Sequence, residues 1–312
     1  MARRNQHDGN GQSAPDEGAA PAHRRASDAG AGALVLIGGA CTPEGDAFGQ
    51  FVELTGARQG GRIVGFTTAS ADPMASAVAW KNDFAAAGAK NVEIPIVDRR
   101  DRAQDPRVAA MVKEADGIFL GGGDQVHLVS TMAGSRVARA IRDAFARGAT
   151  VCGTSAGAAA LTETILAGGE PDETGVMVDM YTGPGFGLLG FHAVIDTHFG
   201  ARRRLHRLFN LIAMNPELMG IGIDEDTALV VRGHLGEVVG KGGVIFVDGR
   251  GVRFDNADDA KRTGASLTLS HLRVGIVGAG YVLDLREREL EVLVRAGDEP
   301  EGTPSVKGEE SR

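Results

Sequence analysis

The chain has 312 residues, of which 43% are hydrophobic and 24% charged, and its formal net charge is −8 at pH 7. This composition is typical of a globular protein with a sizeable core. The negative charge and the low share of aromatic residues, 5%, exclude a general nucleic-acid binder. No apolar run reaches the ~20 residues that a bilayer span needs, so we expect no membrane partner.

The two ends of the chain differ in composition from its middle. Residues 1–31 are polar and rich in Gly, Ala and Asp, which predicts a disordered N-terminal arm. Residues 298–312 have the same character and predict a disordered acidic tail. The two cysteines, Cys41 and Cys152, are too few for a disulfide framework, and they favour a cytoplasmic location.

The first half of the chain alternates short apolar runs with stretches of helical spacing. The apolar runs, which we predict to be strands, are residues 33–39, 62–70, 91–97, 117–124 and 150–155. The predicted helices between them are residues 44–57, 74–89, 105–115 and 135–149. Continuous apolar strands alternating with helices indicate parallel βαβ units. The predicted fold class is therefore α/β, a doubly wound and mainly parallel sheet flanked by helices.

The pattern changes after Leu161. A strand is predicted at residues 191–199, a helix at 201–216, and further strands joined by turns between 219 and 285. We expect these later strands to form an antiparallel C-terminal extension of the same sheet. Since there is no clear linker or repeat, residues 32–297 are predicted to form a single domain.

A nucleophile motif lies where the fifth predicted strand meets a helix. The run from Gly153 to Gly157 fits G-x-S-x-G, in which a strained turn raises a serine hydroxyl and small neighbours admit the substrate. The serine is Ser155, and the N–H of Ala156 can stabilise an oxyanion at the start of the following helix. The alternative is that these small residues only pack a crowded turn.

A serine nucleophile needs a base, and the base needs a carboxylate. His198 ends a predicted strand, where ligand sites of α/β sheets collect, and His127 is its local rival. Asp224, Glu225 and Asp226 follow another strand, and spacing alone does not choose among them. The structural alternative is an acidic turn between two strands.

The glycine-rich loop at residues 121–123 follows the fourth predicted strand. It lacks the residues of a P-loop and the spacing of a dinucleotide fingerprint, so phosphate binding is disfavoured. Its backbone N–H groups, near Gly122, can complete an oxyanion hole beside Ser155.

Four arginines crowd the first turns of the helix predicted at residues 201–216. They are Arg202, Arg203, Arg204 and Arg207. Positive charges at the N-terminus of a helix interact unfavourably with the helix dipole, so we expect an anion to bind these arginines. Arginines beside free helix N–H groups form a carboxylate site. A solvated basic face is the alternative.

Four runs taken in order, "GGGDQ", "GTSAGA", "DTHFGARRRLHRL" and "GIGIDEDTAL", resemble the cyanophycinase family over roughly residues 33–285. These are serine exopeptidases related to α-aspartyl dipeptidase, with a fold like that of class I glutamine amidotransferases. The family releases β-aspartyl-arginine dipeptides from cyanophycin, whose arginines hang by isopeptide bonds from an aspartate backbone. The resemblance implies the same activity and a homodimer.

The resemblance also implies a role for each matching residue. Ser155 matches the family nucleophile, His198 its base and Glu225 its acid. The residues that fall where the family holds its substrate are Gln125, Asp196, Arg202, Arg204 and Arg207. Thr197 stands where family members often have glutamine, which is a departure that bears on substrate preference.

Two alternatives stay open beside this hypothesis. One is an α-aspartyl dipeptidase or another peptidase of the same clan, and the other is a non-catalytic binding protein that kept the fold. The Cys and His spacing offers no zinc site, and we expect no cofactor and no metal.

Overall fold

The computed structural model describes residues 31–171, 177–178 and 180–291. Both predicted disordered segments, residues 1–31 and 298–312, therefore lie outside the described chain, apart from Ala31.

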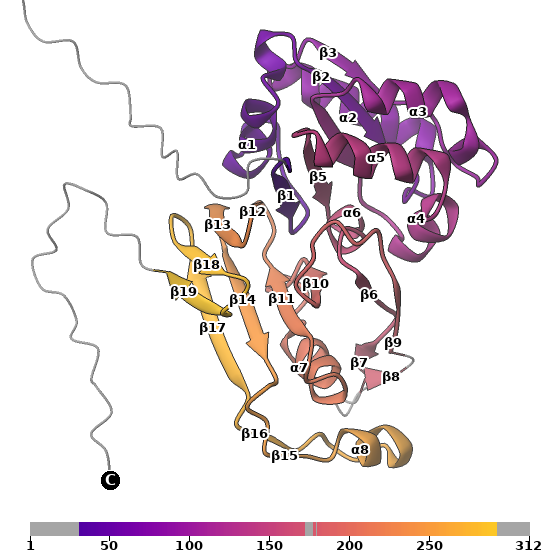
Figure 1. The fold of residues 1–312 in the computed structure, drawn as a ribbon. Coiled ribbons are helices and arrows are strands. Elements are labelled where there is room, and N and C mark those ends of the chain that lie inside the picture. Colours follow the sequence, from indigo (N-terminus) through magenta and orange to yellow (C-terminus); the bar gives the residue numbers. More distant parts are fainter. Residues whose placement is uncertain (1–30, 172–176, 179, 292–312) are drawn as a thin grey trace, which may run out of the picture.

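Five strands build the parallel part of a nine-stranded sheet, in the spatial order β1, β5, β4, β2, β3 (Figure 1). Their bounds are β1 Leu34–Ile37, β2 Arg62–Phe66, β3 Asn91–Glu93, β4 Gly117–Leu120 and β5 Thr150–Thr154. The helices around them are α1 Asp46–Leu54, α2 Pro73–Ala86, α3 Pro106–Lys113, α4 Gln125–Met132, α5 Arg136–Ala146 and α6 Ala156–Ala159. This arrangement confirms the α/β fold class predicted from the alternating pattern.

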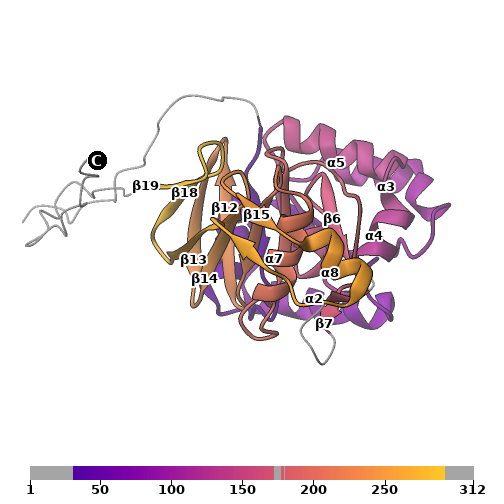
Figure 2. The same cartoon turned by 90° about the horizontal axis from the view of Figure 1, so that it is seen from below.

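Both faces of the parallel strands are buried, as continuous apolar runs require. In β1, Leu34 and Leu36 belong to a core cluster that also contains side chains of α3, α4 and α5. Val35 and Ile37 point the other way, into a second cluster with α1 and α2. The two helical layers lie on opposite sides of the sheet in Figure 2.

Polar side chains cap the N-termini of four of these helices. The side chains of Asp72, Asp105, Asp124 and Ser135 accept hydrogen bonds from N–H groups in the first turns of α2, α3, α4 and α5. Such caps satisfy N–H groups that have no partner within the helix. They fix where each connection turns back onto the sheet.

The predicted antiparallel extension is present on the other side of β1. It contains β12 Thr227–Arg232, β13 Leu235–Gly240, β18 Val282–Asp284 and β19 Glu289–Glu291. β12 pairs antiparallel with β1, with Val35 opposite Val230. The nine-stranded sheet thus ends in four antiparallel strands.

The second half of the chain departs from the prediction in one respect, because four of its strands form a separate sheet. This sheet has the order β10 Ala193–Thr197, β11 Met219–Ile223, β14 Gly243–Asp248 and β17 Arg273–Gly278. Its first pair, β10 and β11, is parallel. The helix α7 Leu205–Met214 lies between them in sequence and packs on β11 through Leu208 and Ile212. The helix predicted from residue 201 therefore begins at Leu205.

Shorter elements complete the described chain. They are the 3-10 turns Ala57–Gln59 and Arg102–Gln104, the helix α8 Ala257–Thr263, and the strands β6 Thr164–Ala167, β7 Glu170–Pro171, β8 Met177–Val178, β9 Tyr181–Pro184, β15 Phe254–Asp255 and β16 Leu269–Ser270. Of these, β6 bears on the site, because it lies next to β10 and supplies Leu166 to the cavity described below.

Candidate active site

Ser155 occupies the sharp turn between β5 and α6. Its backbone has φ 53° and ψ −121°, a left-handed conformation that is strained for a residue with a β-carbon. The flanking glycines are required by crowding. A β-carbon on Gly153 would lie 2.4 Å from the backbone of Gly157, and one on Gly157 would lie 2.1 Å from the carbonyl oxygen of Leu120. The small residues and the raised serine are thus parts of one turn.

Three successive carbonyl groups at the end of β1 hold the parts of the site together. The carbonyl of Ile37 accepts from the N–H of Ser155, and that of Gly38 accepts from the N–H of His198. The carbonyl of Gly39 accepts from the N–H of Asp226. One strand end therefore fixes the backbone of the serine, the histidine and the acidic turn.

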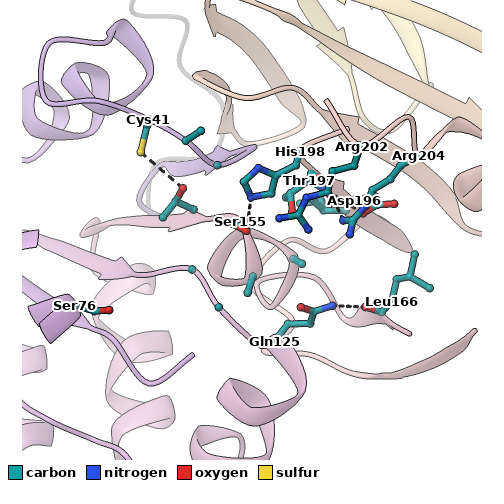
Figure 3. A pocket seen from close by; sticks show the side chains of 18 of the residues that line it. Cys41, Ser76, Gln125, Ser155, Leu166, Asp196, Thr197, His198, Arg202 and Arg204 are labelled. Carbon is teal, nitrogen blue, oxygen red and sulfur yellow. Dashed lines mark hydrogen bonds and ion pairs between the residues drawn. The ribbon is translucent and has the colours of Figure 1, made fainter. Parts of the chain in front are cut away.

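The side chains of Ser155, His198 and Glu225 form a hydrogen-bonded chain. The Oγ of Ser155 lies 2.9 Å from Nε2 of His198 (Figure 3). On the other side of the ring, Nδ1 of His198 lies 2.7 Å from Oε1 of Glu225. The histidine side chain is 14% exposed and the glutamate side chain 41%. A hydroxyl beside an imidazole that a carboxylate orients is the arrangement that activates a serine for attack on a carbonyl.

The rival residues have other surroundings. His127 is exposed on α4, outside the lining of the cavity that contains Ser155. The carboxylate of Asp224 accepts from the N–H groups of Gly200 and Gly243, so it holds two loops. Asp226 pairs with Lys241. Of the three acidic neighbours, Glu225 is the one whose carboxylate contacts His198.

The two residues expected to form an oxyanion hole, Gly122 and Ala156, both lie beside Ser155. Ala156 is the first residue of α6, so its N–H has no acceptor within the helix. A β-carbon on Gly122 would lie 3.2 Å from the β-carbon of Ser155, so this loop runs directly beside the serine. The N–H of Gly122 donates to no other group in the part of the chain that the structure describes.

A buried ion cluster stands behind the histidine. Nη1 of Arg204 lies 2.8 Å from Oδ1 of Asp196, and Nη1 of Arg207 lies 3.3 Å from the same oxygen. Burial raises the pKa of the Asp196 carboxyl, and the charges of Arg207 and Arg204 oppose that rise. Arg207 is 5% exposed and also donates to the carbonyl of Gly168. The sequence predicted that an anion would pair with these arginines, and for Arg204 and Arg207 that anion is the carboxylate of Asp196.

Ser155 opens into a cavity of about 560 Å³, which we call the Ser155 cavity. Of the residues expected to hold substrate, Gln125, Asp196, Arg202 and Arg204 line it (Figure 3), whereas Arg207 lies behind Asp196. Gln125 donates from Nε2 to the carbonyl of Leu166. Thr197, the departure from the family pattern, also lines the cavity. The volume suits a small peptide unit.

Sequence reasoning missed several residues of this cavity. Ser76, Trp80 and Asp83 reach it from α2, and no motif marked them. Their spacing of four and three residues on one helix was the available signal. Cys41 lies in the wall, with Sγ 3.8 Å from Oγ1 of Thr154. Burial raises the pKa of Cys41 to about 11, so its thiol is protonated near neutral pH and a poor nucleophile.

No group of three or more His, Cys, Asp or Glu side chains within the described residues is arranged to hold a metal ion. Among the helices described, none is both long and apolar enough to cross a membrane.

Comparisons with known proteins identify the family of this chain. The model of peptidase family S51 matches residues 34–239. Cyanophycinases from Trichormus variabilis and from Nostoc sp. are each 34% identical to this chain over 267 residues, covering 82% of this chain and 86% of theirs. The crystal structure of a peptidase from an acI-B1 Actinobacterium aligns with a TM-score of 0.55 at 21% identity, over 82% of this chain and 97% of that one, and supports the fold alone.

The fold and the comparisons define the protein class as a serine-type peptidase. Within that class, the chain belongs to peptidase family S51.

Proposed function

We propose that this peptidase is an exopeptidase that hydrolyses cyanophycin to β-aspartyl-arginine dipeptides. In this proposal Ser155 is the nucleophile, His198 the general base and Glu225 the residue that orients the base. The observation that carries the proposal is the chain of two hydrogen bonds, 2.9 Å and 2.7 Å long, that joins Ser155 and His198 of the cavity lining to Glu225. The curated cyanophycinases at 34% identity support the substrate.

Acylation follows from this geometry. His198 takes the proton of Ser155 at Nε2 while Oγ attacks the main-chain carbonyl carbon of an aspartyl residue. The N–H groups of Gly122 and Ala156 stabilise the negative charge on the carbonyl oxygen. The imidazolium then gives its proton to the leaving amine, and the C–N bond breaks. Glu225 stabilises the imidazolium throughout this step.

Deacylation repeats the same transfers with water. His198 removes a proton from a water molecule, and the resulting hydroxide attacks the ester carbon of the acyl-enzyme. The proton returns to Oγ of Ser155 as the ester bond breaks, and the acid product is released. These steps need proton transfer and oxyanion stabilisation, which the groups named above can supply.

The basic wall of the cavity supports an anionic substrate. Arg202 and Arg204 line the cavity next to His198, and Arg202 is exposed to solvent. Each unit of cyanophycin carries the free α-carboxylate of an arginine, which a guanidinium binds through charge-assisted hydrogen bonds. In the proposal Arg207 positions Asp196, and Asp196 positions Arg204.

The test is incubation with purified cyanophycin, followed by mass analysis of the products. Wild-type protein should release β-aspartyl-arginine, and Ser155→Ala should lower turnover by a factor on the order of 10⁴ to 10⁶. Ser130→Ala is the matched control, since Ser130 is an exposed serine of α4 outside the cavity. It should hydrolyse cyanophycin at the wild-type rate.

Three results would contradict the proposal. Wild-type turnover by Ser155→Ala would rule out the serine mechanism. Hydrolysis of Asp-Leu without hydrolysis of cyanophycin would instead favour an α-aspartyl dipeptidase. Failure to hydrolyse either substrate, together with no labelling of Ser155 by a serine-directed reagent, would favour a non-catalytic binding protein.

The assembly and the location belong to the same proposal. We infer a homodimer from the family resemblance, and a cytoplasmic location from the two cysteines, both of which are free thiols in the structure. Light scattering of the purified protein tests the first, and fractionation of the host cell tests the second.

A further inference from the structure

The helix α2 supplies the wall of the Ser155 cavity that lies away from the arginines. Ser76, Trp80 and Asp83 line the cavity from this helix, and their spacing sets them on one helical face. Figure 3 shows Ser76 on one side of Ser155, and Arg202 and Arg204 on the other. The cavity therefore has a basic wall and, across the nucleophile, a wall that bears a carboxylate.

Asp83 is half-buried, and no cation of the described residues pairs with its carboxylate. Its carboxylate forms no hydrogen bond or ion pair with any other group in the described residues. Burial raises the pKa of Asp83, and the negative charge of Glu44 raises it further. Both effects show that the ionised carboxylate is held at a cost here, and a bound cation would remove that cost.

Trp80 precedes Asp83 by about one helical turn on α2 and lines the same cavity. Its ring centroid lies 4.5 Å from that of Phe119 and 5.8 Å from that of Phe48, so the indole is held in place by core packing. A planar guanidinium stacks on an indole face more readily than an ammonium does. A carboxylate next to a fixed indole is thus suited to an arginine side chain.

We propose that Asp83 and Trp80 form a guanidinium subsite that binds an arginine side chain of the substrate. The inference rests on the proposed function, and it adds the specificity-determining residues of the same cavity. The two walls bind the opposite charges of one β-aspartyl-arginine unit. Arg202 and Arg204 attract its carboxylate and repel its guanidinium, whereas Asp83 attracts the guanidinium.

The test compares two short oligomers with the same aspartate backbone, one carrying arginine and the other citrulline. Citrulline has nearly the shape of arginine, but its ureido group is neutral. Wild-type protein should favour the arginine oligomer in kcat/KM by about 10- to 100-fold, the range expected for a hydrogen bond between charged groups. Asp83→Asn should bring this ratio close to one, and Asp83→Lys should reverse the preference.

Asp143→Asn is the matched control, because Asp143 is an exposed carboxylate on α5 outside the Ser155 cavity. It should keep the wild-type ratio. An unchanged ratio in Asp83→Asn would overturn the subsite, and so would equal losses on both oligomers, which indicate a role in cavity shape. Failure of the wild-type protein to hydrolyse either oligomer would overturn the proposed function, and the subsite with it.

Discussion

Gly39 lies against the imidazole of His198 so closely that a β-carbon at this position would sit 2.3 Å from the ring. Gly39 also has φ +104°, a conformation that residues with side chains rarely adopt. Gly39, the second residue after β1, therefore leaves space for the histidine whose other neighbours are Ser155 and Glu225.

Gly39→Ala should displace the His198 ring and lower kcat by at least about 100-fold, because small misplacements of catalytic groups are this costly. Gly148→Ala is its control, since Gly148 has φ +108° with no atom within 4 Å of the added carbon. Gly148→Ala should lose stability on the order of 1 kcal/mol from its positive φ, and Gly39→Ala should lose at least as much, because its β-carbon also displaces a buried ring. Denaturant unfolding and kcat together check this, and equal kcat values in the two variants would argue against the steric explanation.

Glu225→Gln should keep the fold and lose activity. The amide has the shape of the carboxylate but no charge to stabilise the imidazolium, and the corresponding change in a serine protease lowers kcat by about 10⁴. Since the glutamate side chain is 41% exposed, its neutralisation should change the unfolding free energy little. Steady-state kinetics and urea unfolding measure the two effects. A variant with wild-type kcat would remove Glu225 from the proposed triad.

Asp224→Asn should show the opposite behaviour. Both carboxylate oxygens of Asp224 accept backbone N–H groups, from Gly200 and Gly243. An amide can accept only one of them, so stability should fall by about 1–3 kcal/mol. At a temperature where the variant is folded, kcat should fall less than in Glu225→Gln. A larger fall in kcat than in that variant would mean that Asp224 acts in the chemistry.

Substitutions of Arg207 and Arg202 should have different effects, the first on stability and the second on substrate binding. Arg207→Met leaves the buried Asp196 with one arginine fewer, which should cost about 3–5 kcal/mol of stability. Arg202→Ala should leave the unfolding free energy within about 0.5 kcal/mol and raise KM for cyanophycin. Arg203→Ala, on an exposed neighbour outside the cavity, is the control for both measurements. A stable Arg207→Met variant with raised KM would instead place Arg207 in direct contact with substrate.

The stability of the protein should depend on pH through the carboxyl group of Asp248. Burial raises the pKa of this carboxyl, but hydrogen bonds from Arg250 and Arg288 outweigh burial and lower the pKa to about 2. Because the pKa is depressed on folding, the stabilisation is complete above the ordinary value of 3.8 and is lost as pH falls toward 2. A depression of this size corresponds to about 2 kcal/mol.

Urea unfolding of wild-type protein and of Asp248→Asn at a series of pH values measures this contribution. The difference in unfolding free energy between the two should be constant from neutral pH to about 5, and should shrink by about 2 kcal/mol as pH falls to 2. A difference that does not depend on pH would show that Asp248 does not titrate in this range.

The local pattern of the sequence was sufficient for the elements and for the nucleophile turn. Strands β1 to β5 and the helices α1, α2, α3 and α5 follow from period and turn chemistry, because both act over a few neighbouring residues. The helix α4 Gln125–Met132, between β4 and α5, was not predicted. The same patterns did not reveal that β10, β11, β14 and β17 form a sheet of their own. Strand partners are chosen by packing between distant residues, which hydrophobic alternation does not encode.

For the acidic turn and the arginines too, the sequence supplied the candidate residues and the fold decided which of them make contact. Three adjacent carboxylates were equal candidates by spacing, and the fold separates them. Asp226 takes a left-handed conformation with φ 49°, while the Glu225 carboxylate lies next to His198. The arginines were predicted to meet an anion, and the fold supplies Asp196. A side chain's direction depends on the backbone angles of its turn, which the residue types alone leave free.

The sequence by itself determined the α/β alternation, the serine between two glycines and the residue types of the hydrogen-bonded chain. Only the tertiary structure decided that the carbonyls of Ile37, Gly38 and Gly39 hold Ser155, His198 and Asp226 at one strand end. It also decided that α2 faces the same cavity with Asp83. The physical reason is that these contacts join segments far apart in the chain, and they form only when the sheets and helices pack and bury their apolar faces together.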